Sequence, residues 1–201
     1  MIFETVKRNL EKRCYKVSCF ETSAEATDYM CSQIKGKTVG FGGSVTVTKM
    51  GLYERLGENN KVIWHQRMPE GKTDKQVRIE ANNADVYISS VNALAETGEI
   101  VNIDGICNRL AGIFYGHEKV YLVIGKNKLT KDYDSALWRA KNVAAPLNAK
   151  RLNMNTPCAI KGDRCYDCSG PERICCGLSV LWSKPSRDEV EIILINEELG
   201  L

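Results

Sequence analysis

Five of the nine cysteines in the chain gather in one short segment near its C-terminal end. Cys158, Cys165, Cys168, Cys175 and Cys176 follow the spacing C-x6-C-x2-C-x6-C-C. Four thiolates from one polar segment can hold a zinc ion or a 4Fe–4S iron–sulfur cluster. We therefore predict a metal centre on Cys158, Cys165, Cys168 and Cys175, with zinc and iron–sulfur as alternatives and Cys176 as a spare. Free thiols, or a redox pair of Cys165 and Cys168, are the competing interpretation.

A glycine–serine turn is the second candidate site. Residues 38–41 form an apolar run that predicts a buried strand, and Gly42-Gly43-Ser44-Val45-Thr46 follows before a predicted helix. The glycines permit a tight turn, and backbone N–H groups at the start of a helix bind anions, to which the two hydroxyls can contribute. The turn therefore predicts a site for a phosphate or carboxylate. In the alternative interpretation, Ser44 simply caps the helix.

The third candidate site is a polar segment that follows a predicted buried strand over 84–90. Its polar side chains are Asn92, Glu96, Glu99, Asn102, Asp104, Asn108 and Arg109. Ligands of open α/β sheets bind at the carboxyl ends of the strands, where these groups should emerge. There, Glu96 or Glu99 can act as nucleophile or general base, and Arg109 can hold an anion. The run Glu96-Thr97-Gly98-Glu99 also suits an ordinary hairpin turn.

Alternating strands and helices must position these groups. Hydrophobic periodicity predicts strands over 15–20, 38–41, 61–65, 84–90, 119–124 and 190–195, and helices over 3–14, 23–34, 45–56, 72–83, 106–115 and 132–145. Such alternation is typical of parallel βαβ units in a three-layer α/β/α sandwich with a mostly parallel sheet. Pro146 should kink or end the helix before it. Residues 153–178 show no period, so we expect a structured Cys-rich loop inserted before the last strand of a single domain over 1–201.

Composition narrows the classes of function. The length of 201 residues, 43% of them hydrophobic, suits one α/β core, and a net charge of +3 without charge runs gives no support to nucleic-acid binding. No segment approaches the roughly 20 apolar residues that span a bilayer, so we expect no membrane association. The charged N-terminal segment has no secretion signal, which predicts a cytoplasmic protein with reduced thiols.

Several of these motifs together resemble one family. Gly42–Thr46, the run from Asn92 to Gly105, Asn108-Arg109, Ile124-Gly125 and the segment 142–151 are similar to the LUD-domain family. These are the lactate-utilisation proteins, formerly a domain of unknown function. The resemblance places the chain in the superfamily of ribose-5-phosphate isomerase, glucosamine-6-phosphate deaminase and CoA-transferases. It therefore implies a Rossmann-like sandwich that binds a small anionic or phosphorylated metabolite near the Gly-Ser turn.

The resemblance also implies a metabolic role. LUD proteins take part in oxidation of lactate to pyruvate with separate iron–sulfur and flavin-type subunits, which implies an accessory subunit of such a system. The alternative is an isomerase or CoA-transferase-like enzyme that uses Glu96 or Glu99. Where similar methylthioribose-phosphate isomerases carry a catalytic aspartate, this chain has Asn92, and an amide cannot act as that base. The sequence determines neither the substrate nor the oligomeric state, and a homo-oligomer is one of the states compatible with it.

Overall fold

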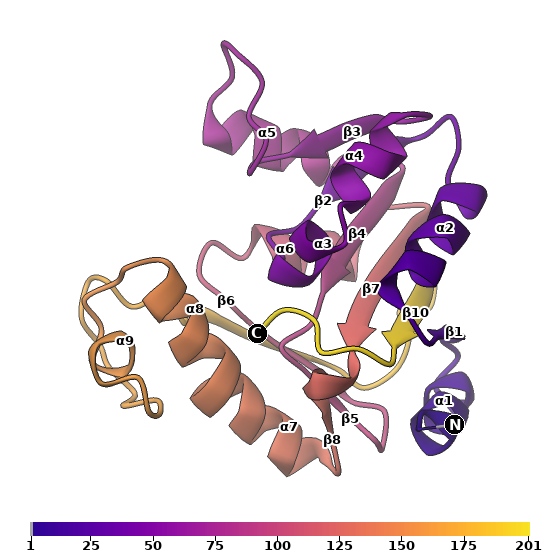
Figure 1. Ribbon diagram of the computed structural model, residues 1–201. Coiled ribbons are helices and arrows are strands. Elements are labelled where there is room, and N and C mark those ends of the chain that lie inside the picture. The colour runs from indigo at the N-terminus through magenta and orange to yellow at the C-terminus, as the bar shows by residue number, and fades with distance from the viewer. Residues whose placement is uncertain (1) are drawn as a thin grey trace.

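A six-stranded parallel sheet organises the fold (Figure 1). The computed structural model describes residues 2–201. Across the sheet the strands are β1 (Lys16–Phe20), β10 (Glu189–Ile195), β7 (Lys119–Gly125), β4 (Val86–Ser90), β2 (Thr38–Phe41) and β3 (Lys61–Trp64), and each neighbouring pair is parallel. The central strands are buried on both faces, which explains their continuous apolar runs. The predicted parallel sheet is confirmed.

Helices cover both faces of this sheet. One face packs against α2 (Ser23–Gln33), α3 (Val45–Lys49) and α4 (Leu52–Gly57), and the other against α1 (Glu4–Lys12), α5 (Asp74–Ala81) and α6 (Asn108–Phe114). Capping boxes start two of these helices, at Thr22 before α2 and at Thr73 before α5. The helix predicted over 45–56 is broken in two at Gly51, whose φ is 63°. The predicted three-layer sandwich is confirmed.

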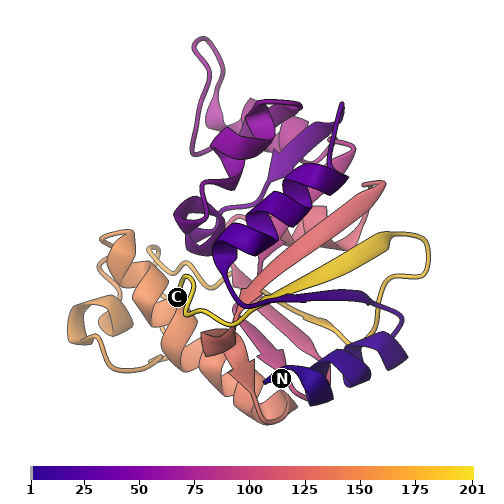
Figure 2. The same cartoon turned by 45° about the vertical axis from the view of Figure 1, so that its right-hand side comes forward.

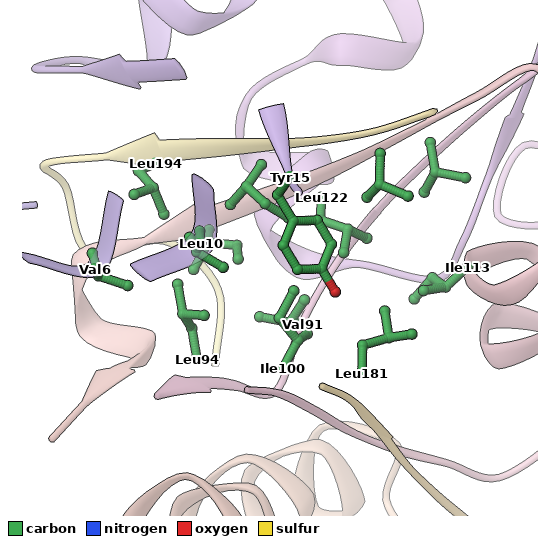
Figure 3. Close-up of a cluster of buried hydrophobic side chains, with 14 of the residues drawn as sticks. Val6, Leu10, Tyr15, Val91, Leu94, Ile100, Ile113, Leu122, Leu181 and Leu194 are labelled. Carbon is green, nitrogen blue, oxygen red and sulfur yellow. The ribbon is translucent and has the colours of Figure 1, made fainter. Parts of the chain in front are cut away.

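A second, four-stranded sheet was missed by the sequence analysis. It contains β8 (Leu129–Thr130), β5 (Ala93–Ala95), β6 (Ile100–Asp104) and β9 (Gly177–Leu181), in that order. Its strands are short, and their side chains alternate between two faces. Leu94 and Ile100 face the main sheet, as Figure 3 shows, with Leu122 and Leu194 on the opposite side of the cluster. The alanines of β5 point the other way and pack against α7 (Tyr133–Arg139).

Pro146 does not end the helix, which was one of the two effects expected of it. The helix runs through α7, a π-helical turn η2 (Ala140–Ala144) and α8 (Ala145–Arg151). A proline lacks the N–H of a regular helical turn, and the widened turn directly before it bonds the Ala145 N–H to the Ala140 carbonyl instead. The helix therefore reaches Arg151 and, in Figure 2, lies beside the C-terminal segment.

The segment 153–178 is less irregular than predicted. It contains a short helix, α9 (Pro157–Lys161), with Pro157 in its first turn, a position where a missing N–H costs nothing. Cys158 and Ala159 of α9 pack against Ala149 of α8. After this segment the chain enters β9 and then β10, which returns to the main sheet as expected.

A 3-10 turn, η1 (Lys126–Lys128), follows β7. Between residues 2 and 201, no helix is long and apolar enough to cross a membrane.

The contacts of the Glu191 carboxylate in β10 predict a pH-dependent contribution to stability. Its buried carboxylate accepts hydrogen bonds from Ser18 and Tyr29, each at 2.7 Å, and pairs with Lys119 at 2.8 Å and Lys16 at 3.1 Å. Burial alone would raise the pKa of Glu191, but these donors outweigh it and hold the pKa below its ordinary value. Glu191→Gln should therefore lower the free energy of unfolding by about 2 kcal/mol at neutral pH.

The same contacts fix the sign of the pH effect. A lowered folded-state pKa stabilises the protein above the ordinary value of 4.5, and this contribution is lost as the pH falls through the folded pKa. The difference between wild type and Glu191→Gln should thus shrink in acid when urea unfolding is measured across that range. Glu189→Gln, an exposed change on the same strand, should have no such effect. An equal loss at every pH would contradict the assignment.

Candidate functional site

A crevice opens where the connections of the main sheet reverse direction. From β2 the chain turns to β3 on one side, whereas from β4 it proceeds to β7 on the other. Ligands of open parallel sheets bind outside the carboxyl ends of strands at such a switch point. A cavity of about 540 Å³ lies there, a size that suits a small molecule. Of the predicted residues, it is lined by Gly43, Ser44, Thr46, Asn92, Asp104, Asn108, Arg109 and Cys175.

The glycine–serine turn forms one wall. Gly42 lies behind the wall, and a Cβ there would come within 2.7 Å of Ser89 Oγ and 3.0 Å of the Arg109 side chain, so only glycine fits. Gly43 borders the crevice next to His65. The Ser44 hydroxyl accepts the Val47 N–H at 3.2 Å, as expected of a helix N-cap. This hydroxyl therefore shapes the turn in addition to lining the crevice.

Lys128 is the functional candidate that the sequence analysis missed. It is 4% exposed and lines the crevice, and its Nζ donates to Ser90 Oγ at 2.7 Å and to Thr46 Oγ1 at 2.9 Å. Burial, followed by the charges of Arg139 and Arg109, lowers the pKa of Lys128 to about 7. The one sequence signal was its place just after a buried strand, at the ligand-binding edge of the sheet.

The crevice has a surplus of positive charge. Both of its lining Asp side chains are already paired, Asp74 with Arg78 at 2.7 Å and Asp104 with Arg109 at 3.6 Å. In the part of the chain that the structure describes, no carboxylate lies within 4.0 Å of the Lys128 amine. A buried cation without a counter-ion is unfavourable. An anionic ligand would supply the missing charge.

Arg109 holds the crevice wall together. Its guanidinium donates to the Asn102 side chain at 2.6 Å and the Ser90 carbonyl at 3.1 Å, and also to the Ile103 carbonyl at 2.7 Å and the Asn92 side chain at 3.3 Å. These contacts join the end of β4 to β6. The guanidinium N–H groups that were expected to hold an anion therefore donate to the protein itself, and the side chains of Asn92 and Asn102 are among their acceptors. The geometry gives Arg109 a positioning role.

Glu96 and Glu99 lie outside the crevice, contrary to the expectation for a catalytic carboxylate. They occupy the turn between β5 and β6, and the Glu99 carboxylate pairs with Arg13 at the end of α1 and accepts the Thr97 hydroxyl. Gly98 between them has a φ of 106°, a conformation that favours glycine. The alternative interpretation, an ordinary hairpin turn, describes this segment. Neither glutamate is among the residues that line the crevice.

Asn108 and His65 also line the crevice. Asn108, the first residue of α6, accepts a hydrogen bond from Arg78 at 3.0 Å. His65 follows β3, and burial together with the charge of Arg78 lowers its pKa to about 4, so its ring is neutral at physiological pH. Its Nδ1 is buried without a partner in the described residues. A neutral imidazole can donate or accept one hydrogen bond to a ligand.

The Cys-rich segment reaches the crevice. Ile174 and Cys175 line it, whereas Cys158 lies in α9. Burial and the neighbouring thiols of Cys165, Cys158 and Cys168 raise the pKa of Cys175 to about 11. All nine cysteines are free. Over residues 2–201, no three His, Cys, Asp or Glu side chains converge closely enough to hold a metal ion as the structure stands.

Comparisons with known proteins identify the family and support the fold. Residues 3–195 match the LUD domain. A structure of a DUF162 family protein from Deinococcus radiodurans is similar over 96% of each chain, with 10% identity and a TM-score of 0.56. The structure of eIF2B beta from Chaetomium thermophilum matches 66% of this chain and 44% of that chain at 13% identity, with a TM-score of 0.33, which is too low to support an argument. No curated protein matches the chain.

Proposed function

Since this chain belongs to the LUD-domain family, we propose that it serves the utilisation of lactate or a related organic acid by binding a small anionic metabolite. The observation that carries this proposal is Lys128, a buried amine that lines the crevice and has hydroxyls but no carboxylate as partners. A carboxylate or phosphate would accept a hydrogen bond from its remaining N–H and balance its charge. The metabolite would lie between Lys128 and the turn at Gly43 and Ser44.

An accessory role fits the geometry better than catalysis by a glutamate. The alternative function, chemistry of the isomerase or CoA-transferase type, needs a carboxylate that reaches the bound metabolite. Glu96 and Glu99 lie outside the crevice, and Asp104 within it is paired with Arg109. We therefore propose a metabolite-binding subunit that acts together with iron–sulfur subunits of an oxidation system. We place it in the cytoplasm, where its free thiols stay reduced.

A ligand that binds only the native state should raise the melting temperature. We expect lactate, pyruvate or inorganic phosphate to stabilise the protein, because about 100-fold excess over Kd contributes about 2.7 kcal/mol. For a chain of this size, that corresponds to a rise of roughly 5–10 °C. The measurement is thermal unfolding at constant ionic strength, with chloride as the control anion. The effect should be larger below pH 7, where the Lys128 amine is charged.

Two variants separate this binding from the alternative function. Glu96→Gln and Glu99→Gln should leave the anion-induced shift unchanged, because neither side chain lines the crevice. Loss of the shift in either variant would favour a crevice carboxylate mechanism instead. If none of the three anions stabilises the wild type beyond the chloride control, the proposed metabolite site is wrong.

A further inference from the structure

The turn between Cys165 and Cys168 is shaped for thiolates. Asp167 adopts a left-handed conformation with a φ of 49°, which is uncommon outside glycine and favoured among others by aspartate. This conformation points the Asp167 N–H at Cys165 Sγ, at 3.3 Å. A backbone N–H directed at sulfur stabilises its ionised form and orients it as a ligand. The two cysteines thus leave one tight turn with a donor already in place.

Arg173 fastens this turn to Cys175. Its Nε donates to the Cys175 carbonyl at 2.9 Å, one Nη donates to the Cys168 carbonyl, and both Nη atoms lie 3.4 Å from the Asp167 carboxylate. One guanidinium therefore connects Cys175, two residues before β9, with the turn that carries Cys165 and Cys168. Its positive charge is also suited to offset a cluster of thiolates.

The fourth cysteine arrives from a separate element. Cys158 lies in α9, which packs on Ala149 of α8 together with Tyr166 and Ile174. This small apolar cluster ties α9 to the rest of the segment. Tyr166 directly follows Cys165 and Ile174 directly precedes Cys175, so this cluster brings Cys158 into the neighbourhood of both cysteines. The fold has therefore gathered the four cysteines from three places in the segment.

We propose that Cys158, Cys165, Cys168 and Cys175 form a four-thiolate metal site on the wall of the crevice. The occupant is a zinc ion or a 4Fe–4S cluster, both of which take four thiolates. Because the four sulfurs do not yet converge, binding must tighten the segment around the metal, with release of the thiol protons. Since Cys175 also lines the crevice, metal and metabolite would share a wall.

The structure distinguishes Cys175 from its neighbour. Adjacent residues entering a strand point to opposite sides. Cys176 is exposed and its Sγ contacts the Arg173 carbonyl at 3.5 Å, whereas Cys175 is partly buried and lines the crevice. Cys175 is thus the ligand, and Cys176 is the matched control.

Metal and acid-labile sulfide analysis of anaerobically purified protein tests the site. About one zinc per chain without sulfide identifies zinc, whereas about four irons and four sulfides with absorption at about 400 nm identify the cluster. Either result supports the proposal. Less than about a tenth of these amounts, in protein purified anaerobically and again after reconstitution with zinc or with iron and sulfide, would overturn it.

Serine variants assign the ligands. Cys158→Ser, Cys165→Ser, Cys168→Ser and Cys175→Ser should each lower the bound metal at least fivefold, and Cys176→Ser and Cys14→Ser should retain it. Circular dichroism of each variant shows whether the α/β core is intact. As a second readout, metal removal should increase trypsin cleavage at Lys161, Arg164 and Arg173 in the wild type. Full metal content in Cys175→Ser, or unchanged cleavage after metal removal, would refute this assignment.

Discussion

Lys128→Met is expected to abolish stabilisation by small anions and, at the same time, to stabilise the unliganded protein. Burial and the charges of Arg139 and Arg109 lower the pKa of Lys128 from 10.5 to about 7. At about 1.36 kcal/mol per pKa unit, keeping this amine in the fold costs roughly 4 kcal/mol at neutral pH. Loss of its hydrogen bonds to Thr46 and Ser90, about 1 kcal/mol each, offsets part of the gain. We expect a net gain of about 2 kcal/mol.

The pH dependence identifies the source of this gain. The folded pKa lies below the unfolded value, so the unfolded state binds more protons between about pH 7 and 10.5. Wild-type stability should therefore rise across this window, and the cost should be complete below it. Lys128→Met lacks this slope, so its advantage should shrink as the pH rises. Urea unfolding at a series of pH values measures both quantities.

A surface lysine provides the control. Lys131 is exposed and lies three residues further along the chain. Lys131→Met should leave both the anion-induced shift and the pH slope as in the wild type. If Lys128→Met retains the anion-induced shift, the amine does not bind the ligand. If it also loses stability at neutral pH, the hydrogen bonds to Thr46 and Ser90 outweigh the buried charge, and the energetic argument is wrong as well.

The main sheet was predictable because its strands are long apolar runs. The second sheet was not, because its strands are short. The strands of the parallel sheet are apolar runs, so residues 119–124 and 190–195 were assigned to strands from hydrophobicity alone. By contrast, β5 has three residues and β8 has two, too few to show alternation. The persistence of the helix through Pro146 depends on a π turn, which hydrophobic periodicity does not reveal.

Site residues were predictable where they directly follow a strand of the main sheet. They were not predictable where their position depends on how strands pair and side chains pack in the folded protein. The Gly42–Thr46 turn and the segment after β4 were found because they directly follow strands, and each contributes residues to the lining of the crevice. Glu96 and Glu99 were assigned to the crevice by the same rule, but they follow the small β5 strand, which leads away from the main sheet. Lys128 shares its one sequence signal, a place just after a buried strand, with Lys126. Only its burial between Thr46 and Ser90 distinguishes it.

Arg109→Met should be among the most destabilising substitutions in the crevice wall, lowering the free energy of unfolding by about 4 kcal/mol. Methionine retains much of the aliphatic volume but removes all donors, so the Asn102 side chain, the carbonyls of Ser90 and Ile103 and the Asp104 carboxylate lose a partner. Removing one member of a buried ion pair typically costs about 3–5 kcal/mol, because the remaining charge is left uncompensated. Chemical denaturation of the purified variants gives this difference directly.

Three further variants show whether the network, and not simple loss of volume, explains the effect of Arg109→Met. Arg109→Lys should recover little stability, because one ammonium cannot reach acceptors arranged around a planar guanidinium. Adding Asp104→Asn to Arg109→Met should cost less than the sum of the two single changes, since the uncompensated carboxylate is then gone. Arg55→Met, which breaks an exposed pair with Asp28, should have no measurable effect. Additive losses for Arg109 and Asp104 would show that the two side chains are not coupled, and the ion-pair explanation for the size of the Arg109→Met effect would be wrong.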